Sequence, residues 1–128
     1  MNPVALSCSA VLGLLLFGLG AAVSVTRIRT KTSAGVPSDP AHRLTKIARA
    51  HANTAEFAPF LALVFLYFGM HQPSTTILAL IVAATVCRCL IVIGLVMPPT
   101  MANPHPARVV GALGTYVCGL ALSAALFF

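Results

Sequence analysis

Charged residues are scarce in this sequence. Of its 128 residues only 8% are Asp, Glu, Lys or Arg, and just two residues, Asp39 and Glu56, are acidic. Soluble globular domains carry about 25% charged residues, so the composition excludes an ordinary soluble domain. The hydrophobic fraction is 59% and the mean hydropathy is +0.96. The sequence therefore predicts an integral membrane protein, with the lipid bilayer as its surroundings.

Four apolar runs are each long enough to cross the hydrocarbon core of a bilayer, which takes about 20 helical residues. They are Pro3 to Val25, Ala50 to Gly69, Thr75 to Met97 and Val109 to Phe128. We predict an all-α membrane protein, a bundle of four transmembrane helices in one domain covering residues 1–128. The first run is not a signal peptide on this interpretation, because no basic residue precedes it and its apolar stretch is too long.

The net charge of +6 arises from basic residues that cluster in one part of the chain. Six of the eight lie between the first apolar run and the start of the second, namely Arg27, Arg29, Lys31, Arg43, Lys46 and Arg49. Such a cluster predicts that the first loop is cytoplasmic. The third loop then returns to the cytoplasm and both termini lie outside, in the inner or plasma membrane if the chain is bacterial. We interpret the charge as topology bias and expect no nucleic-acid partner.

The cysteines lack the spacing of a metal site. Cys8, Cys87, Cys89 and Cys118 all fall within predicted spans. We expect buried thiols, and we assign no metal ion.

One stretch around the start of the second span is polar on one side. Six side chains fall within a helical stripe about 100° wide: Lys46, Arg49, Asn53, Glu56, Phe60 and Leu63. A charge in hydrocarbon costs about 2.5–3.5 kcal/mol on insertion scales, so these groups need partners in a bundle or a wet cavity. The stripe is therefore a candidate site.

The same stretch resembles a family signature. Arg49, Ala50, Asn53, Glu56 and Pro59 match R-A-x-x-N-x-x-E-x-x-P, found in the second helix of the MAPEG family, the membrane-associated proteins in eicosanoid and glutathione metabolism. The resemblance implies a homotrimer with its sites between subunits. It also implies a glutathione-dependent transferase or peroxidase that acts on lipophilic electrophiles, with glutathione as co-substrate.

Glutathione carries two carboxylates, one ammonium and a thiol, so its site needs cations, one anion and a group that stabilises the thiolate. By the resemblance, the residues that bind it are Arg27, Arg29, Arg49, His51, Asn53 and Glu56. The arginines would hold the carboxylates, Glu56 the ammonium, and Asn53 and His51 the peptide. For Arg27 and Arg29 a second interpretation remains open, in which they extend to anionic lipid headgroups.

The starts of two helices can be predicted from their capping residues. Residues 38–40 are expected to cap the second helix, which then starts near Ala41, and Asn103 is expected to cap the fourth. Arg108 would lie in the opening turns of the fourth helix. The resemblance gives it the catalytic role of stabilising the glutathione thiolate.

Arg88 is the single charged residue of the third span. One interpretation pairs it with Glu56 inside the membrane, as a purely structural ion pair. The other makes it a residue behind the site that orients Glu56 for the ligand.

This chain departs from many catalytic members of the family. Phe57 stands where those members have tyrosine, and Ile91 and Leu95 stand where they have His or Tyr. The resemblance thus leaves an alternative function, a non-catalytic scaffold that binds lipid or glutathione. A small multidrug exporter is a further alternative, but that class needs a glutamate in its first helix, which this chain lacks.

Overall fold

Four long helices make up the fold. The computed structural model describes residues 1–128. The helices are α1 (Pro3–Thr30), α2 (Arg43–Met70), α3 (Thr75–Val96) and α4 (Pro106–Ala125). All four are long and apolar enough to cross a membrane. The prediction of an all-α membrane protein with four transmembrane helices is therefore confirmed.

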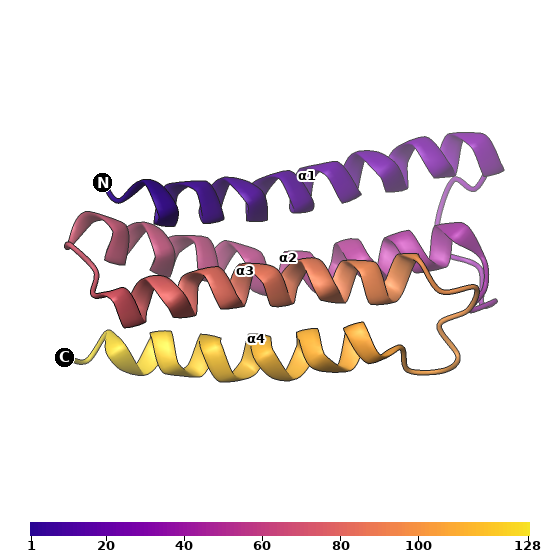
Figure 1. The fold of residues 1–128 in the computed structure, drawn as a ribbon. Helices are drawn as coiled ribbons and strands as arrows, with labels where there is room; N and C mark the ends of the chain where they lie inside the picture. The colour runs from indigo at the N-terminus through magenta and orange to yellow at the C-terminus, as the bar shows by residue number, and fades with distance from the viewer.

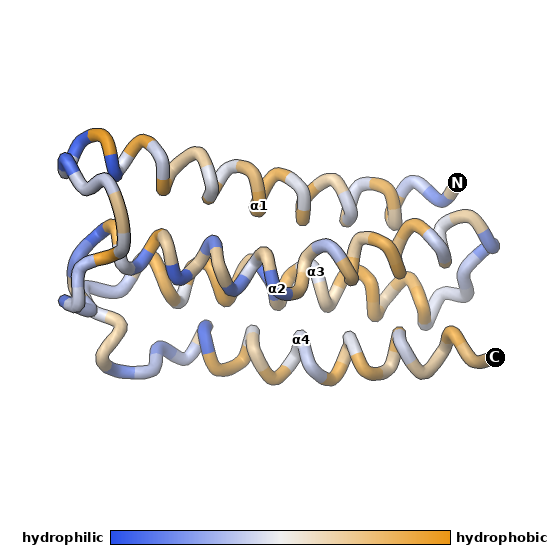
Figure 2. Tube along the Cα trace, turned by 180° about the vertical axis from the view of Figure 1, so that it is seen from behind, coloured by the Kyte–Doolittle hydropathy of each residue, from blue (hydrophilic) through white to orange (hydrophobic).

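Successive helices run in opposite directions (Figure 1). Both termini lie at one end of the bundle with the α2–α3 loop, and the other two loops lie at the opposite end. α1 packs along α2 and α3 along α4, while α1 and α4 make no contact. Figure 2 shows hydrophilic residues concentrated at the end with two loops and along part of α2. The predicted site thus lies on the most polar helix, near the end that carries the basic loop.

The two loops at the polar end are bonded to each other. The backbone N–H of Met101 donates to the carbonyl oxygen of Pro40 at 3.1 Å. Lys46 Nζ donates to the carbonyl oxygen of Pro98 at 2.8 Å. Lys46, which belongs to the predicted stripe, therefore holds the α3–α4 loop in place.

The start of α2 differs from the prediction. Its N-cap is His42, whose ring Nδ1 accepts from the backbone N–H of Leu44 at 3.1 Å. Asp39 instead accepts from the N–H of Ala41 at 2.8 Å and closes a turn before the helix. The predicted cap at residues 38–40 is wrong, because the acidic side chain stabilises the preceding turn and an imidazole nitrogen serves as the acceptor.

The start of α4 differs in the same way. His105 is the N-cap, and its Nδ1 accepts from the N–H of Ala107 at 3.3 Å. The first proline of the helix is Pro106, so the predicted cap at Asn103 is also wrong. Arg108 consequently lies in the first turn of α4, where the unpaired N–H groups of a helix create positive potential.

Close approach of α3 and α4 depends on glycine. A Cβ at Gly94 would lie 2.5 Å from the backbone nitrogen of Arg108, and one at Gly111 would lie 2.6 Å from the carbonyl oxygen of Cys87. No side chain fits at either position without moving the backbone of the other helix. The first turn of α4, and Arg108 with it, is therefore fixed against α3.

The core of the bundle is apolar and so is much of its outside. The fully buried side chains include Leu12, Phe65, Ile81 and Leu122. Large apolar side chains also face outward, as Phe17 does with 78% of its surface exposed. All four cysteines are free, but only Cys118 is buried, so the prediction of buried thiols is wrong for the other three, which are partly exposed. Such an exterior is suited to lipid or to another copy of the chain.

Candidate functional site

A polar cavity lies between α2 and α4, near the end that carries the basic loop. It has a volume of about 190 Å³ and is lined by Arg49, Asn53, Ile91, Leu95, Arg108, Ala112 and Tyr116. Three predicted site residues, Arg49, Asn53 and Arg108, thus meet here although Arg108 is far from the other two in sequence. The lining has two guanidinium groups and no carboxylate, so it is suited to an anion.

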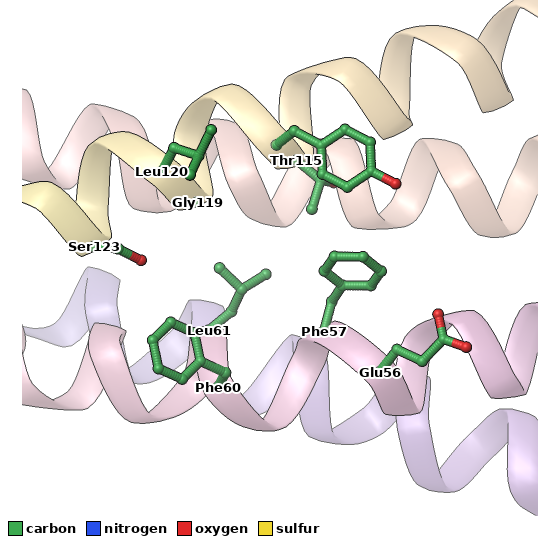
Figure 3. A pocket seen from close by; sticks show the side chains of 9 residues that line it. Glu56, Phe57, Phe60, Leu61, Thr115, Gly119, Leu120 and Ser123 are labelled. Atoms are coloured by element: carbon green, nitrogen blue, oxygen red, sulfur yellow. The ribbon is translucent and has the colours of Figure 1, made fainter.

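An apolar groove adjoins this cavity, farther along the same two helices. Its volume is about 300 Å³. Figure 3 shows Glu56, Phe57, Phe60 and Leu61 of α2 on one side and Thr115, Gly119, Leu120 and Ser123 of α4 on the other. Glu56 is exposed on the outside of the bundle. The groove can hold an apolar molecule, and the carboxylate of Glu56 marks its polar end.

Arg88 is fully buried behind the cavity and is bonded to Asn53. Its Nη2 donates to the backbone oxygen of Asn53 at 2.9 Å and to Oδ1 at 2.8 Å. Its guanidinium carbon lies 4.9 Å from the centroid of the Phe57 ring, a cation–π contact. Both sequence interpretations joined Arg88 to Glu56. Within one chain Arg88 forms no salt bridge with Glu56, and its direct partner is Asn53. That Arg88 orients Glu56 for the ligand stays a prediction.

A model of the MAPEG family matches residues 5–128, essentially the whole chain. The chain belongs to the MAPEG family. The family identified from the second-helix motif is thereby confirmed. Membership supports a membrane role in glutathione-related transfer or in lipid metabolism. No curated protein and no solved structure matches the chain.

The remaining predicted residues of this MAPEG protein lie on another side of the bundle. His51 packs against α1, where a Cβ on Gly20 would lie 3.2 Å from its Nε2. Arg27 lines an open hollow at the end of α1, and Arg29 nearby is exposed. Because α1 and α4 do not touch, and His51 faces α1, a single chain does not bring Arg27, Arg29 or His51 to Arg108. The predicted residues thus form two separate groups.

Tyr116 lies at the site and was missed by the sequence interpretation. It lines both the polar cavity and the apolar groove, and its ring centroid is 5.9 Å from that of Phe57. A signal for it was present, since Tyr116 follows Arg108 by eight residues, a spacing that keeps both on one side of a helix. The MAPEG protein therefore does present a phenol at its site, from α4.

The chemistry available here comes from arginines, one carboxylate and one phenol. No group of three or more His, Cys, Asp or Glu side chains lies close enough to hold a metal ion. The first turn of α4 and the two guanidinium groups of Arg49 and Arg108 together favour negative charge in the cavity.

Proposed function

We propose that this MAPEG protein is a glutathione-dependent transferase or peroxidase that acts on lipophilic electrophiles. The observation that carries the proposal is the position of the 190 Å³ cavity, lined by Arg49 and Arg108, beside an apolar groove of about 300 Å³. The first suits an anionic peptide and the second an apolar molecule. The two reactants would therefore meet where the cavity joins the groove.

Arg108 holds the glutathione sulfur as a thiolate in this proposal. Lowering the pKa of a thiol by two units requires about 2.7 kcal/mol. A partly buried guanidinium and the start of a helix are together sufficient for that effect. Arg49 holds a carboxylate and Glu56 the ammonium, while Asn53 keeps its position through Arg88. The thiolate then attacks the electrophile and forms a carbon–sulfur bond.

The predicted site residues that lie away from Arg108 are the reason to propose a homotrimer. Arg27, Arg29 and His51 face away from Arg108 in one protomer. A head-to-tail interface places one surface of a subunit against a different surface of the next, and it closes into a ring. If α1 of one subunit covers the α2–α4 surface of its neighbour, both groups contribute to one site. Arg27 or Arg29 then holds the second carboxylate, and His51 contacts the peptide.

The orientation in the membrane follows from the basic loop. The α1–α2 and α3–α4 loops lie at one end of the bundle (Figure 1), and the six clustered basic residues belong to that end. We place this end in the cytoplasm and both termini outside. Glutathione then enters the polar cavity from the cytoplasm, and the lipophilic substrate enters the groove from the bilayer.

The test is a comparison of glutathione binding with thiolate formation in detergent. Isothermal titration measures binding, and ultraviolet absorbance titrated against pH measures the thiolate. We expect wild type to bind and ionise glutathione. In Arg108→Ala the thiol pKa should return towards its value in water while the affinity changes by no more than about threefold. Arg43→Ala, an exposed arginine in the first turn of α2, is the control and should change neither.

Two outcomes would contradict this proposal. If Arg108→Ala leaves the thiol pKa unchanged, Arg108 does not stabilise the thiolate. If wild type binds glutathione without forming a thiolate at neutral pH, the protein acts as a binding scaffold. Phe57, Ile91 and Leu95, which lack the polar groups of many catalytic relatives, would then be explained.

A further inference from the structure

We propose that Tyr116 is a further catalytic residue, whose hydroxyl donates a proton to the oxygen that leaves the carbon attacked by the glutathione sulfur. The inference rests on the proposed function and extends it to one class of substrate. The expected substrates are electrophiles with an oxygen leaving group, such as epoxides.

The position of Tyr116 is the first argument. It is the only residue that lines both the polar cavity and the apolar groove. Arg49 and Arg108 belong to the cavity alone, and Glu56 and Phe60 to the groove alone. A thiolate held in the cavity and an electrophile held in the groove can meet only near their common boundary. The group at that boundary contacts the reacting atoms.

The hydroxyl of Tyr116 is available for a substrate. It forms no hydrogen bond within the protomer, and 52% of the side chain is exposed on the outside of the bundle. A phenol within a membrane span usually finds a hydrogen-bond partner, because an unpaired donor in hydrocarbon is costly. The ring itself is placed by Phe57, at 5.9 Å between centroids. The protomer therefore positions the ring and leaves the hydroxyl free.

Arg88 and Tyr116 line the same small cavity. The guanidinium is fully buried, and its Nε and Nη1 have no hydrogen-bond partner. A small cavity of about 20 Å³ separates it from Tyr116 and is also lined by Asn53 and Thr115. That is enough space for one water molecule, which needs two to four polar partners. The unpaired N–H groups of Arg88 can donate to such a water, so the polar side of Tyr116 lies next to space that a water molecule or a substrate oxygen can occupy.

The chemical step balances without another reactant. The thiolate attacks one carbon of the epoxide, a carbon–sulfur bond forms, and the carbon–oxygen bond breaks with its electron pair on oxygen. The proton of Tyr116 passes to that oxygen and leaves a hydroxyl group on the product. The proton released when the next glutathione thiol ionises restores the phenol. An aryl chloride differs because chloride departs as a stable anion and requires no proton.

Tyr116→Phe tests the inference by using both kinds of electrophile. The variant keeps the ring and removes only the hydroxyl. We expect kcat for styrene oxide to fall about 100-fold, within the usual range for loss of a general acid. We expect kcat for chlorodinitrobenzene to stay within about twofold of wild type, because that reaction needs no proton in the transition state. Glutathione affinity, thiolate absorbance and melting temperature should not change.

The second tyrosine supplies the control. Tyr67 lies near the far end of α2 and stacks on His71, away from the site. Tyr67→Phe should leave both reactions unchanged. If Tyr116→Phe slows both reactions equally, or slows neither, Tyr116 is not a proton donor and the inference is overturned. The thiolate absorbance of wild type tests the proposed function separately, and if no thiolate forms, both the function and this inference are rejected.

Discussion

Arg88 of α3 donates through one nitrogen, Nη2, to both oxygens of Asn53 of α2, at 2.9 Å to the backbone and 2.8 Å to the side chain. Arg88 has no exposed surface. The asparagine of the family motif therefore binds a buried cation as well as lining the cavity. This pair joins α2 to α3 directly behind the site, and it fixes the cavity wall on which Arg49 and Asn53 lie.

Removing the asparagine side chain should destabilise the fold. Asn53→Ala takes away one of two acceptors from a buried guanidinium, and hydrogen bonds to charged groups are worth about 1.5–3 kcal/mol. We expect the free energy of unfolding in detergent to fall by about that amount, measured by thermal melting followed by circular dichroism. Glu56→Gln is the control, because Glu56 is exposed and forms no hydrogen bond in the protomer. An unchanged melting temperature for Asn53→Ala would show that the bond has no net effect on stability.

Glutathione binding should depend on the charges of α2. Arg49→Ala and Glu56→Gln each remove one charge-assisted contact to glutathione, so each should weaken binding by more than about tenfold. Isothermal titration measures the affinity, and Arg43→Ala should bind as wild type does. If both variants fold and bind normally, the polar stripe is structural and glutathione binds elsewhere.

Packing of α3 on α4 should be sensitive to one methyl group. Gly94→Ala places a Cβ within 2.5 Å of the backbone nitrogen of Arg108. Overpacking of this kind costs about 1–3 kcal/mol, and the displaced helix start should also reduce thiolate formation. Gly13→Ala is the matched control, since a Cβ there meets nothing within 4 Å. Equal melting temperatures for the two variants would contradict the close approach of α3 and α4.

A shared site in a homotrimer can be tested by complementation. Arg27→Ala and Arg108→Ala each damage one of the two groups of site residues. When the two variants assemble at random in equal amounts, each site in a head-to-tail trimer takes Arg27 from one subunit and Arg108 from the next. About a quarter of the sites then have both arginines intact. We expect the co-expressed mixture to bind and ionise more glutathione than either variant alone, and native mass spectrometry should detect trimers. A site contained in one protomer would recover nothing on mixing.

Hydropathy alone determined the four spans and their order, because a helix in lipid must satisfy its own backbone hydrogen bonds over about 20 apolar residues. The family motif occupies the single stretch from Arg49 to Pro59, so the family could be recognised from that stretch alone. Helix starts were less predictable, since a histidine ring can accept the hydrogen bond that an Asn or Asp usually takes. His42 and His105 do so here.

Relationships between helices were decided by the tertiary structure. Which residue of α2 binds Arg88 depends on how α2 is rotated about its own axis, because consecutive residues of a helix point in directions about 100° apart. That rotation turns Asn53 to α3 and Glu56 outward. Tyr116 reaches the site because Gly94 and Gly111 bring α4 close to α3. The sequence by itself determined which residues carry charge and which segments cross the membrane, and only packing between helices decided which of those residues meet.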